Sequence, residues 1–404
     1  MENYETFPEA YEAYYNDNIP FRNQLIRFNN SIDYFLFSQS SNEDVVIGKD
    51  DWLFFCSSTE GNPVEQSLGY WSFTEDELEK IADNLMDAKR VLESQGIEFV
   101  LFLAPNKETI YRDKLPDYYK VQNEYTSTEQ LVDYLKEKTD IRVIYPKQDL
   151  LDAREENPDI TLYHKLDTHW NHAGAYVGAR SLAKELEIEM PSFADIFLEP
   201  VVSSSGDLTN MLNITIKNGD IDYDISGINT LKTEKTESEE GAVFSYHTPG
   251  GDSRRVFVCR DSYAEALAPN LATQFKDSTW VHAKIFKPQQ IFDYNTDIFI
   301  LEAVERRERE LESFRVSSVS CSVENEGERK KISIAPELPK DNLQYVSIFK
   351  KRNGEKAFET IQALKAVESP VVLDVPVDET GEICIRVFKD KSSSETLDEV
   401  SIKY

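Results

Sequence analysis

Amphipathic helical segments and short apolar strands alternate through most of this sequence, and that alternation restricts the fold more than any other feature. Residues 74–96 carry apolar side chains at helical spacing behind a Thr74–Glu77 capping box, and residues 97–104, IEFVLFLA, form an almost unbroken apolar run. Such a run is typical of a central parallel strand covered on both faces. The order of helix and strand therefore predicts a parallel sheet with helices on both sides.

The same order recurs along the chain. Further predicted elements are helices at 128–138, 174–186 and 263–275 and strands at 141–146, 254–259, 278–286 and 296–304. We therefore predict an α/β fold with a doubly wound, mostly parallel sheet. In such a sheet ligands bind beyond the carboxyl ends of the strands, so the loops that follow strands are where a site should lie.

The pattern changes near residue 315. The charged stretch 305–315 is expected to form a helical linker, and the residues beyond it alternate apolar and polar side chains between turn signals. That alternation predicts a small β-sandwich of the immunoglobulin, fibronectin or carbohydrate-binding kind. We therefore predict two domains, an α/β domain at 1–315 and a β-sandwich domain at 316–404.

The charge of the chain argues against some partners. A formal net charge of −30 over 404 residues repels phosphate backbones and anionic lipid surfaces, so we expect no nucleic acid partner. The same charge also maintains solubility and does not identify a ligand. No apolar run reaches the roughly 18 residues of a membrane helix, and we expect no membrane insertion by these residues.

The four cysteines show no spacing typical of a zinc site, and we expect neither a metal nor an organic cofactor. Cys321 and Cys384 both fall in the predicted sandwich. They could form a disulfide or remain two buried thiols, and the sequence leaves both readings open.

Three of the five histidines lie in one short segment, YHKLDTHWNHAGAY at 163–176. His169 follows Asp167 by two residues, in a loop ahead of a predicted helix. A carboxylate beside an imidazole can fix its tautomer and stabilise its charged form. The pair therefore has the residue types of a catalytic base and its orienting acid, although Asp167 could simply cap the helix.

Ser262 supplies the hydroxyl that such a base would need. It lies between the strand 254–259 and the helix 263–275, at the expected carboxyl edge of the sheet. There the N–H groups of the turn can stabilise an oxyanion, and His169 can remove the hydroxyl proton. The serine could instead only cap the helix. The neighbouring Asp261 is expected to shape the turn.

Five motifs in order resemble the alginate O-acetyltransferase AlgX/AlgJ family of SGNH-hydrolase-like proteins. They are GKDDWLFF at 48–55, APNKETIYRDKLP at 104–116, YHKLDTHWNHAGA at 163–175, GDLTNML at 206–212 and RDSYAEALAPNLATQF at 260–275. Several separated motifs in order are a stronger signal than any one alone. The resemblance covers the chain up to the charged stretch, and it implies that the α/β fold is SGNH-hydrolase-like.

The resemblance implies an O-acetyltransferase that moves an acetyl group through an acyl-serine to hydroxyls of an extracellular or cell-wall polysaccharide. The family's Asp and His fall on Asp167 and His169, and its serine falls on Ser262. A membrane-bound O-acyltransferase is the implied acetyl donor. The implied location is outside the cytoplasmic membrane, in the periplasm or at the cell surface, with an N-terminal anchor that this sequence does not include.

Two polar residues follow the strand 97–104. Asn106 and Lys107 are expected to face the same crevice as Ser262, where the Asn106 amide could donate to an oxyanion. The pair could equally form a turn without a catalytic role. In the earlier motif GKDDWLFF, the aromatic residues Trp52 and Phe54 are expected in the core.

Three larger side chains adjoin the expected triad. Trp170 and Tyr263 suit stacking on a sugar face but could equally be packed under the loops. Arg260 stands two places before the serine, where many members of the family carry a small residue. We expect Arg260 to pair with a carboxylate rather than to steer a substrate oxygen.

Two other functions remain open on the sequence alone. A carbohydrate acetyl esterase would use the same triad, with water in place of the sugar hydroxyl at the acyl-serine. A non-catalytic scaffold that binds polysaccharide would leave Ser262 without a chemical role.

Overall fold

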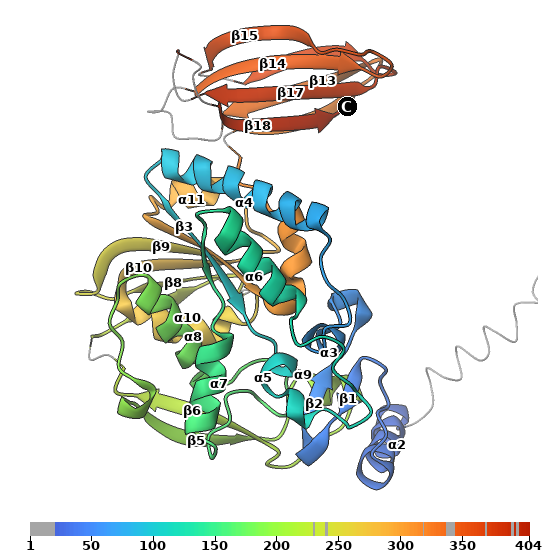
Figure 1. Ribbon diagram of the computed structural model, residues 1–404, viewed down its shortest axis with the longest axis vertical. Helices are drawn as coiled ribbons and strands as arrows, with labels where there is room; N and C mark the ends of the chain where they lie inside the picture. The colour runs from blue at the N-terminus through green and yellow to red at the C-terminus, as the bar shows by residue number, and fades with distance from the viewer. Residues whose placement is uncertain are drawn as a thin grey trace, which may run out of the picture.

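The structure is a computed structural model, and it describes residues 21–228, 231–238, 241–317, 319–336, 344–367, 370–388, 392 and 396–404. The first 20 residues of the predicted α/β domain lie outside this part of the chain. The described residues form one large sheet of seven strands in the order β4–β3–β11–β9–β10–β8–β7, and two smaller sheets near the C-terminus (Figure 1).

The main sheet is built from β3 (Glu98–Ala104), β4 (Arg142–Ile144), β7 (Glu234–Glu237), β8 (Val243–His247), β9 (Asp252–Arg260), β10 (Phe275–His282) and β11 (Ile298–Val304). Two antiparallel pairs lie outside it, β1 (Val45–Ile47) with β2 (Leu53–Phe55) and β5 (Phe197–Ser203) with β6 (Asp220–Ser226).

The described α-helices are α2 (Arg22–Phe37), α3 (Pro63–Ser67), α4 (Glu75–Ser94), α5 (Lys107–Ile110), α6 (Ser127–Lys138), α7 (Lys147–Glu156), α8 (His172–Glu185), α9 (Asp207–Leu212), α10 (Ala264–Leu271) and α11 (Gln289–Asp293). Short 3-10 helices are η1 (Lys49–Asp51), η2 (Ser58–Glu60), η3 (Arg112–Lys114), η4 (Phe193–Asp195), η5 (Ala272–Gln274) and η6 (Glu305–Ser313).

The sheet is mostly parallel, as predicted. Strands β4, β3, β11, β9 and β10 run in one direction, and β8 pairs antiparallel with both β10 and β7. Helices cover both faces of the sheet. This confirms the predicted doubly wound α/β fold.

Strand β3, which lies between β4 and β11 in the main sheet, shows how the core is divided between the two faces. Its side chains alternate, so that Phe99 and Leu101 pack with residues of α4 and α6, whereas Val100 and Phe102 pack with residues of α8 and α10. All four side chains are buried. The unbroken apolar run in the sequence therefore reflects a strand that is covered on both sides.

The carboxyl edge of the sheet brings two distant loops together. Strands β9 and β11 are parallel neighbours, with Leu301 opposite Cys259. Three residues after Leu301, Val304 ends β11, and three residues after Cys259, Ser262 lies just beyond the end of β9. The backbone N–H of Val304 donates to Asp261 Oδ2 at 2.7 Å, which joins the two strand ends directly.

Among the described C-terminal residues, seven strands form two antiparallel sheets, as the predicted sandwich requires. One sheet has the order β12–β13–β16 and the other β15–β14–β17–β18. These strands are β12 (Val319–Glu326), β13 (Arg329–Pro336), β14 (Gln344–Arg352), β15 (Glu359–Val367), β16 (Val371–Pro376), β17 (Gly381–Phe388) and β18 (Thr396–Lys403). Buried isoleucine and valine side chains from both sheets fill the space between them.

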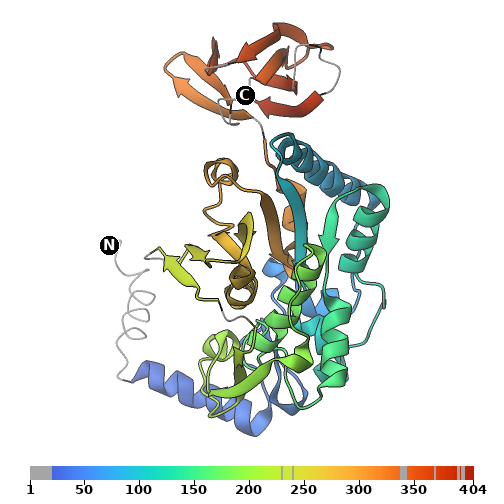
Figure 2. The ribbon, with the colours of Figure 1, turned by 90° about the vertical axis from the view of Figure 1, so that its left-hand side faces the viewer.

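The sandwich lies beyond α4, and the antiparallel pair β5–β6 lies at the opposite end of the molecule (Figures 1 and 2). Leu397 of β18 packs against the core beneath α4 as well as against the core of the sandwich. Cys321 and Cys384 are both free thiols. The division into domains at residue 315 stays a prediction.

The charged stretch expected as a linker is helical, but much of it is buried. Helix η6 is of the 3-10 type and buries Glu305, Glu308 and Leu311. It packs along α4, where Asn84 Nδ2 donates to the carbonyl oxygen of Glu312 at 2.6 Å. The stretch is thus helical, as predicted, with Glu305 and Glu308 buried, and its role as a linker between two domains stays a prediction.

Candidate active site

The turn after β9 holds Ser262 between two buried neighbours. Asp261 Oδ1 accepts the backbone N–H of Tyr263 at 2.8 Å, and its Oδ2 accepts the N–H of Val304. Ser262 itself is partly exposed. Asp261 therefore shapes the turn, as expected, and leaves the serine hydroxyl at the surface of the sheet edge.

The hydroxyl of Ser262 lies against the ring of His169. His169 Nε2 is 2.8 Å from Ser262 Oγ, and its Nδ1 is 2.6 Å from Asp167 Oδ1. The structure thus brings the three residues expected as a triad into one continuous hydrogen-bonded chain. A hydroxyl, an imidazole and a carboxylate in this order can activate the hydroxyl as a nucleophile.

Asp167 is held at both carboxylate oxygens. Oδ1 accepts the backbone N–H of His169 at 3.1 Å in addition to its contact with the ring, and Oδ2 accepts the N–H of Asp207 at 2.8 Å. Burial opposes ionisation here, but the hydrogen bonds from His169 and Asp207 outweigh it and hold the pKa of Asp167 below its usual range. The carboxylate of Asp167 is therefore ionised at neutral pH and can stabilise a protonated His169 ring.

Asp207 and Gly206 complete the loop that carries the base. The Asp207 carboxylate accepts from the backbone N–H of Thr168 at 2.8 Å and from its hydroxyl at 2.5 Å. A Cβ atom on Gly206 would lie 2.4 Å from the carbonyl oxygen of Leu166 and 2.7 Å from Cβ of Asp167. Only glycine allows the two loops to approach this closely.

Asp207 was missed as a functional residue in the sequence, although it lies in the GDLTNML motif. Its partners are 39 and 40 residues away along the chain. The motif itself was the available signal, since a glycine and an acid together ahead of a short helix suggest a close backbone contact.

Lys107 supports the same loop from inside the protein. Its fully buried ammonium donates to the carbonyl oxygens of Asp167, His164 and Lys165 at 2.6, 3.2 and 3.4 Å. Burial lowers the pKa of Lys107, while nearby carboxylates, led by Glu108, act against that shift. Lys107 thus contacts the backbone behind Asp167 and does not line the crevice in front of Ser262.

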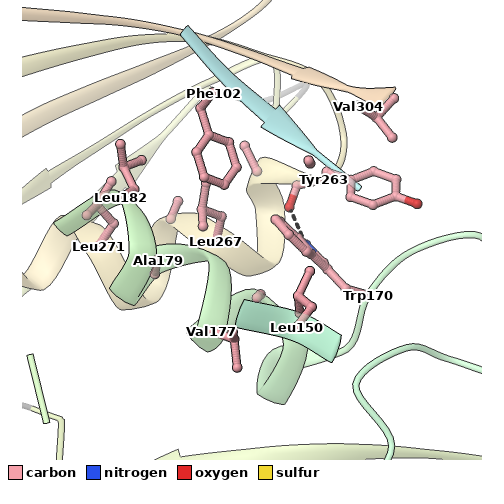
Figure 3. Close-up of a cluster of buried hydrophobic side chains, with 14 of the residues drawn as sticks. Phe102, Leu150, Trp170, Val177, Ala179, Leu182, Tyr263, Leu267, Leu271 and Val304 are labelled. Carbon is pink, nitrogen blue, oxygen red and sulfur yellow. Dashed lines mark hydrogen bonds between the residues drawn. The ribbon is translucent and has the colours of Figure 1, made fainter. Parts of the chain in front are cut away.

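Tyr263 and Trp170 are packed beneath the loops. They are 0% and 1% exposed, which leaves no ring face free for a sugar. Tyr263 donates its hydroxyl hydrogen to the carbonyl oxygen of Thr168 at 2.6 Å. Trp170 Nε1 donates to the carbonyl oxygen of Tyr263 at 2.9 Å, the bond drawn as a dashed line in Figure 3. These bonds tie the loop of His169 to the turn of Ser262.

Asn106 does not point toward Ser262. Its side-chain nitrogen donates to Gln66 Oε1 at 3.0 Å, and its side-chain oxygen accepts from Arg306 Nη1 at 3.3 Å. Its backbone N–H donates to Glu305 Oε2 at 2.7 Å. Of the two readings that the sequence left open, that of an oxyanion donor therefore finds no supporting contact, because the amide is already bonded inside the protein.

Arg260 pairs with a carboxylate, as expected. Its side chain is 1% exposed, and Nη1 lies 3.1 Å from Glu265 Oε1. Nη2 donates to the carbonyl oxygen of Gly241 at 2.7 Å, and the guanidinium lies over the ring of Phe244. These contacts anchor the end of β9 to the segment before β8.

The other histidines of the cluster contact different acids. His172 Nδ1 lies 2.7 Å from Asp222 Oδ2, and His164 Nδ1 lies 3.4 Å from Asp220 Oδ1. Asp220 also accepts the backbone N–H groups of two residues in the His164 loop. These pairs join that loop to β6. Of the three clustered histidines, His169 therefore belongs to the triad, whereas His164 and His172 hold the loop against β6.

A cavity of about 820 Å³ opens in front of Ser262. Its other polar walls come from η2, from the end of β10 and from η6, and include Asn62, His282, Lys284 and Arg306. Four cationic side chains, Lys284, Arg306, Arg307 and Arg309, line the cavity together with four acidic ones, Glu60, Glu65, Asp261 and Glu310, so its wall carries both charges. Arg306 was not singled out in the sequence, because it lies within the charged stretch expected to be a linker.

The described residues also contain one group with the spacing of a metal site. Ligand atoms of Asp167, His169 and Asp207 lie within 4.8 Å of one another. Each of these atoms already takes part in the hydrogen bonds that orient the imidazole and the Thr168 loop. The chemistry of this donor set is accounted for by the hydroxyl–imidazole–carboxylate chain.

Comparisons with known proteins agree with this arrangement. A model of the family described as "SGNH hydrolase-like domain, acetyltransferase AlgX" matches residues 45–249, a range that includes Asp167 and His169 and ends before Ser262. Among solved structures, Bacillus cereus PatB1 is similar with a TM-score of 0.50 and 18% identity, over 66% of this chain and 96% of that one. At this identity the likeness shows the fold alone.

Two curated proteins, each described as a probable alginate O-acetylase AlgJ, are 27% identical to this chain. The alignment with the Pseudomonas fluorescens protein covers 45% of this chain and 43% of the relative, and that with the Pseudomonas aeruginosa protein covers 44% and 41%. The chain thus spans less than half the length of these relatives. Because the family model matches just over half of the chain, this protein belongs to the AlgX family of SGNH hydrolase-like acetyltransferase domains.

Proposed function

We propose that this protein is a serine-dependent O-acetyltransferase that acetylates hydroxyls of an extracellular or cell-wall polysaccharide. The observation that carries the proposal is the chain of two hydrogen bonds, 2.8 Å from Ser262 to His169 and 2.6 Å from His169 to Asp167, in a member of this family. The description of its relatives as probable alginate O-acetylases supports a polysaccharide acceptor.

The first half-reaction forms the acyl-enzyme. Ser262 Oγ attacks the carbonyl carbon of an acetyl ester as its proton passes to His169 Nε2. The tetrahedral intermediate collapses with cleavage of the ester C–O bond, and His169 returns the proton to the departing oxygen. Asp167 holds the ring in position and stabilises the imidazolium in both steps.

The second half-reaction reverses these roles. A sugar hydroxyl enters the cavity in front of Ser262 and gives its proton to His169 while its oxygen attacks the acetyl carbonyl carbon. Collapse of the second intermediate releases the acetylated sugar and returns the proton to Ser262. Water in place of the sugar hydroxyl would make the protein an esterase.

The acetyl donor and the location follow from the family resemblance. A membrane-bound O-acyltransferase is the proposed source of the acetyl group, and the proposed location is outside the cytoplasmic membrane. Within the described residues, every helix is too short or too polar to cross a lipid bilayer.

The test uses the full chain with 4-nitrophenyl acetate and a series of oligosaccharides. We expect Ser262→Ala to lower acetate release by several orders of magnitude, because the nucleophile is lost, while Ser72→Ala at an exposed site retains full activity. Mass spectrometry should show an acetyl group on Ser262 and then on the sugar.

Each alternative has its own outcome in this assay. Acetate release that no oligosaccharide diverts would assign an esterase instead of a transferase. Activity that survives Ser262→Ala would remove the triad from the proposal. A protein that binds oligosaccharide but releases no acetate would be a scaffold.

A further inference from the structure

The turn around Ser262 offers few free donors for an oxyanion. The N–H of Asp261 donates to Glu302 Oε2 at 2.8 Å, and the N–H of Tyr263 donates to Asp261 Oδ1. Among the described residues, the N–H of Ser262 has no acceptor within the protein. One backbone N–H alone provides less stabilisation than the two or more donors of a typical oxyanion hole.

Arg306 is a candidate for a second donor to the oxyanion, because its guanidinium is not engaged in an ion pair with any described residue. Among the described residues its guanidinium forms no ion pair with a carboxylate, and its buried Nε has no hydrogen-bond partner. Its neighbours in the cavity wall differ, since Arg307 pairs with Glu310 and Arg309 pairs with Glu77. Burial opposes the charge of this guanidinium, but the nearby side chains of Tyr263, Asp261 and Glu108 favour it and raise the pKa of Arg306. The arginine is therefore charged and is not tied to a single carboxylate.

The guanidinium of Arg306 is held in place by three contacts. It lies over the rings of Tyr263 and Phe55, with distances of 5.4 and 5.7 Å from Cζ to the ring centroids. Its Nη1 donates to Asn106 Oδ1 at 3.3 Å. Stacking on two rings limits the rotation of the planar group, so that its remaining N–H groups are pre-oriented.

The fold brings Arg306 to Ser262. The two residues follow the parallel neighbours β11 and β9 at the same edge of the sheet, and both line the cavity of about 820 Å³. Tyr263, the residue after the serine, carries the ring on which Arg306 stacks. Arg306 and Ser262 therefore line the same cavity.

We propose that Arg306, together with the backbone N–H of Ser262, binds the oxyanion of both tetrahedral intermediates. This inference rests on the proposed function. As Ser262 Oγ bonds to the acetyl carbonyl carbon, the C=O π electrons move to the oxygen, and Arg306 donates a hydrogen bond to the resulting O⁻ without transferring a proton. When the C=O bond re-forms and the leaving oxygen departs, the charge and the hydrogen bond weaken together.

The role of Asn106 changes with this proposal. Its amide does not contact the substrate, but its oxygen fixes Nη1 of Arg306, and its nitrogen is itself fixed by Gln66. Asn106 is then a positioning residue that acts through the arginine. Its place directly after β3, which suggested an oxyanion donor, reflects this indirect contribution.

The test measures kcat and KM for 4-nitrophenyl acetate with the full chain. We expect Arg306→Ala to lower kcat by about 10²- to 10³-fold with little change in KM, as for loss of an oxyanion-hole donor. Millimolar guanidinium should restore part of the activity of Arg306→Ala, which a merely structural defect would not allow. Asn106→Ala should lower kcat less, and the double variant should be no slower than Arg306→Ala.

The control and a milder variant keep the test decisive. Arg307→Ala removes an ion-paired guanidinium from the same wall, and a loss as large as that in Arg306→Ala would overturn the assignment. If Arg306→Ala does not fold, Arg306→Lys replaces it, with an expected fall in kcat of at least tenfold. Full kcat in whichever of the two Arg306 variants folds would also overturn the assignment of Arg306. Failure of guanidinium to rescue Arg306→Ala would do the same.

Sulfonylation separates this inference from the proposed function. Methanesulfonyl fluoride forms a Ser262 Oγ–S bond, releases fluoride and passes the serine proton to His169, and mass spectrometry follows the adduct. An unaltered protein that neither reacts nor releases acetate would refute the proposed function and this inference with it. An active protein whose Arg306→Ala variant reacts at the same rate in both assays would refute the inference alone.

Discussion

Asp167 Oδ2 accepts the backbone N–H of Asp207 at 2.8 Å across 40 residues of sequence. The other oxygen, Oδ1, contacts both the backbone N–H and the ring of His169, so each carboxylate oxygen of Asp167 has a partner that fixes its position. Orientation of the base thus depends on a loop that the family resemblance does not assign to catalysis. The close approach of Gly206 to Leu166 makes that dependence geometric as well as electrostatic.

Replacing Asp207 should impair the base without removing it. Asp207→Ala loses both hydrogen bonds to Thr168, and a small displacement of the neighbouring His169 can lower the rate by about 10²-fold. We expect a fall of this order in kcat/KM for 4-nitrophenyl acetate, with the unfolding temperature nearly unchanged. Asp224→Ala, at an exposed site on β6, is the control. Equal activity in the two variants would show that Thr168 needs no such support.

Replacing Asp167 should affect both catalysis and acid stability. Asp167→Asn keeps the shape of the side chain but removes the charge that fixes the tautomer of His169, and loss of about 10⁴-fold in kcat is the expected order. The pKa of Asp167 is lower in the folded state than in the unfolded state, so it contributes stability above the unfolded value of about 3.9. That contribution is lost as the pH falls below about 4.

Urea unfolding at several acidic pH values measures this second effect. The unaltered protein should lose stability below about pH 4 more steeply than Asp167→Asn, which has no proton to take up at this position. Parallel curves for the two proteins would mean that Asp167 is equally acidic in the folded and unfolded states.

Glu308 should make the protein less stable as the pH rises. Burial raises the pKa of this carboxyl from 4.5 to about 8, so between these values the folded state keeps a proton that the unfolded state has lost. Stability therefore falls through this window, by about 1.4 kcal/mol per pH unit for one proton. Glu308→Gln mimics the protonated form and can still accept from Gln66 and Ser127.

Chemical unfolding at pH 5, 6, 7 and 8 tests that slope. The difference in unfolding free energy between Glu308→Gln and the unaltered protein should grow in favour of the variant as the pH rises. Glu310→Gln changes a more exposed carboxylate on the same helix and should leave the slope as it is. A constant difference between pH 5 and pH 8 would contradict the assignment of Glu308 as the protonated group.

Lys107 should contribute to stability and to activity through one set of bonds. Lys107→Met leaves three backbone carbonyls of the His169 loop without this donor, and a buried unsatisfied acceptor costs about 1–3 kcal/mol. We expect a lower unfolding temperature and a lower kcat, measured by calorimetry and ester hydrolysis. Lys120→Met at an exposed site is the control. A stable variant with normal kcat would show that the carbonyls find other donors.

Local sequence signals predicted the regular elements well. The capping box of Thr74 and Glu77 correctly placed the start of α4, and the apolar run before Pro105 correctly placed β3. Helix periodicity and strand composition are local properties, so they can be read without knowledge of the fold. The exposed strands β5 and β7 were not predicted, because their sequences lack a clear alternation of buried and exposed side chains.

The site was only partly predictable for a related reason. Ser262 and the Asp167–His169 pair could be chosen because each follows a recognisable local pattern. The direction of the Asn106 side chain and the burial of Trp170 depend on partners far away in sequence. Arg306 was assigned to a linker because composition cannot reveal which charged residues of a helix face the core.

The contact between Val304 and Asp261 has a consequence for synthesis of the chain. The turn that carries Ser262 is fixed by the last strand of the sheet, and β11 lies between β3 and β9. A nascent chain that has already emerged through Ser262 therefore still lacks β11, the strand that lies between β3 and β9 in the finished sheet. Until residues near Val304 leave the ribosome, the polypeptide carries all three members of the triad without the framework that aligns them.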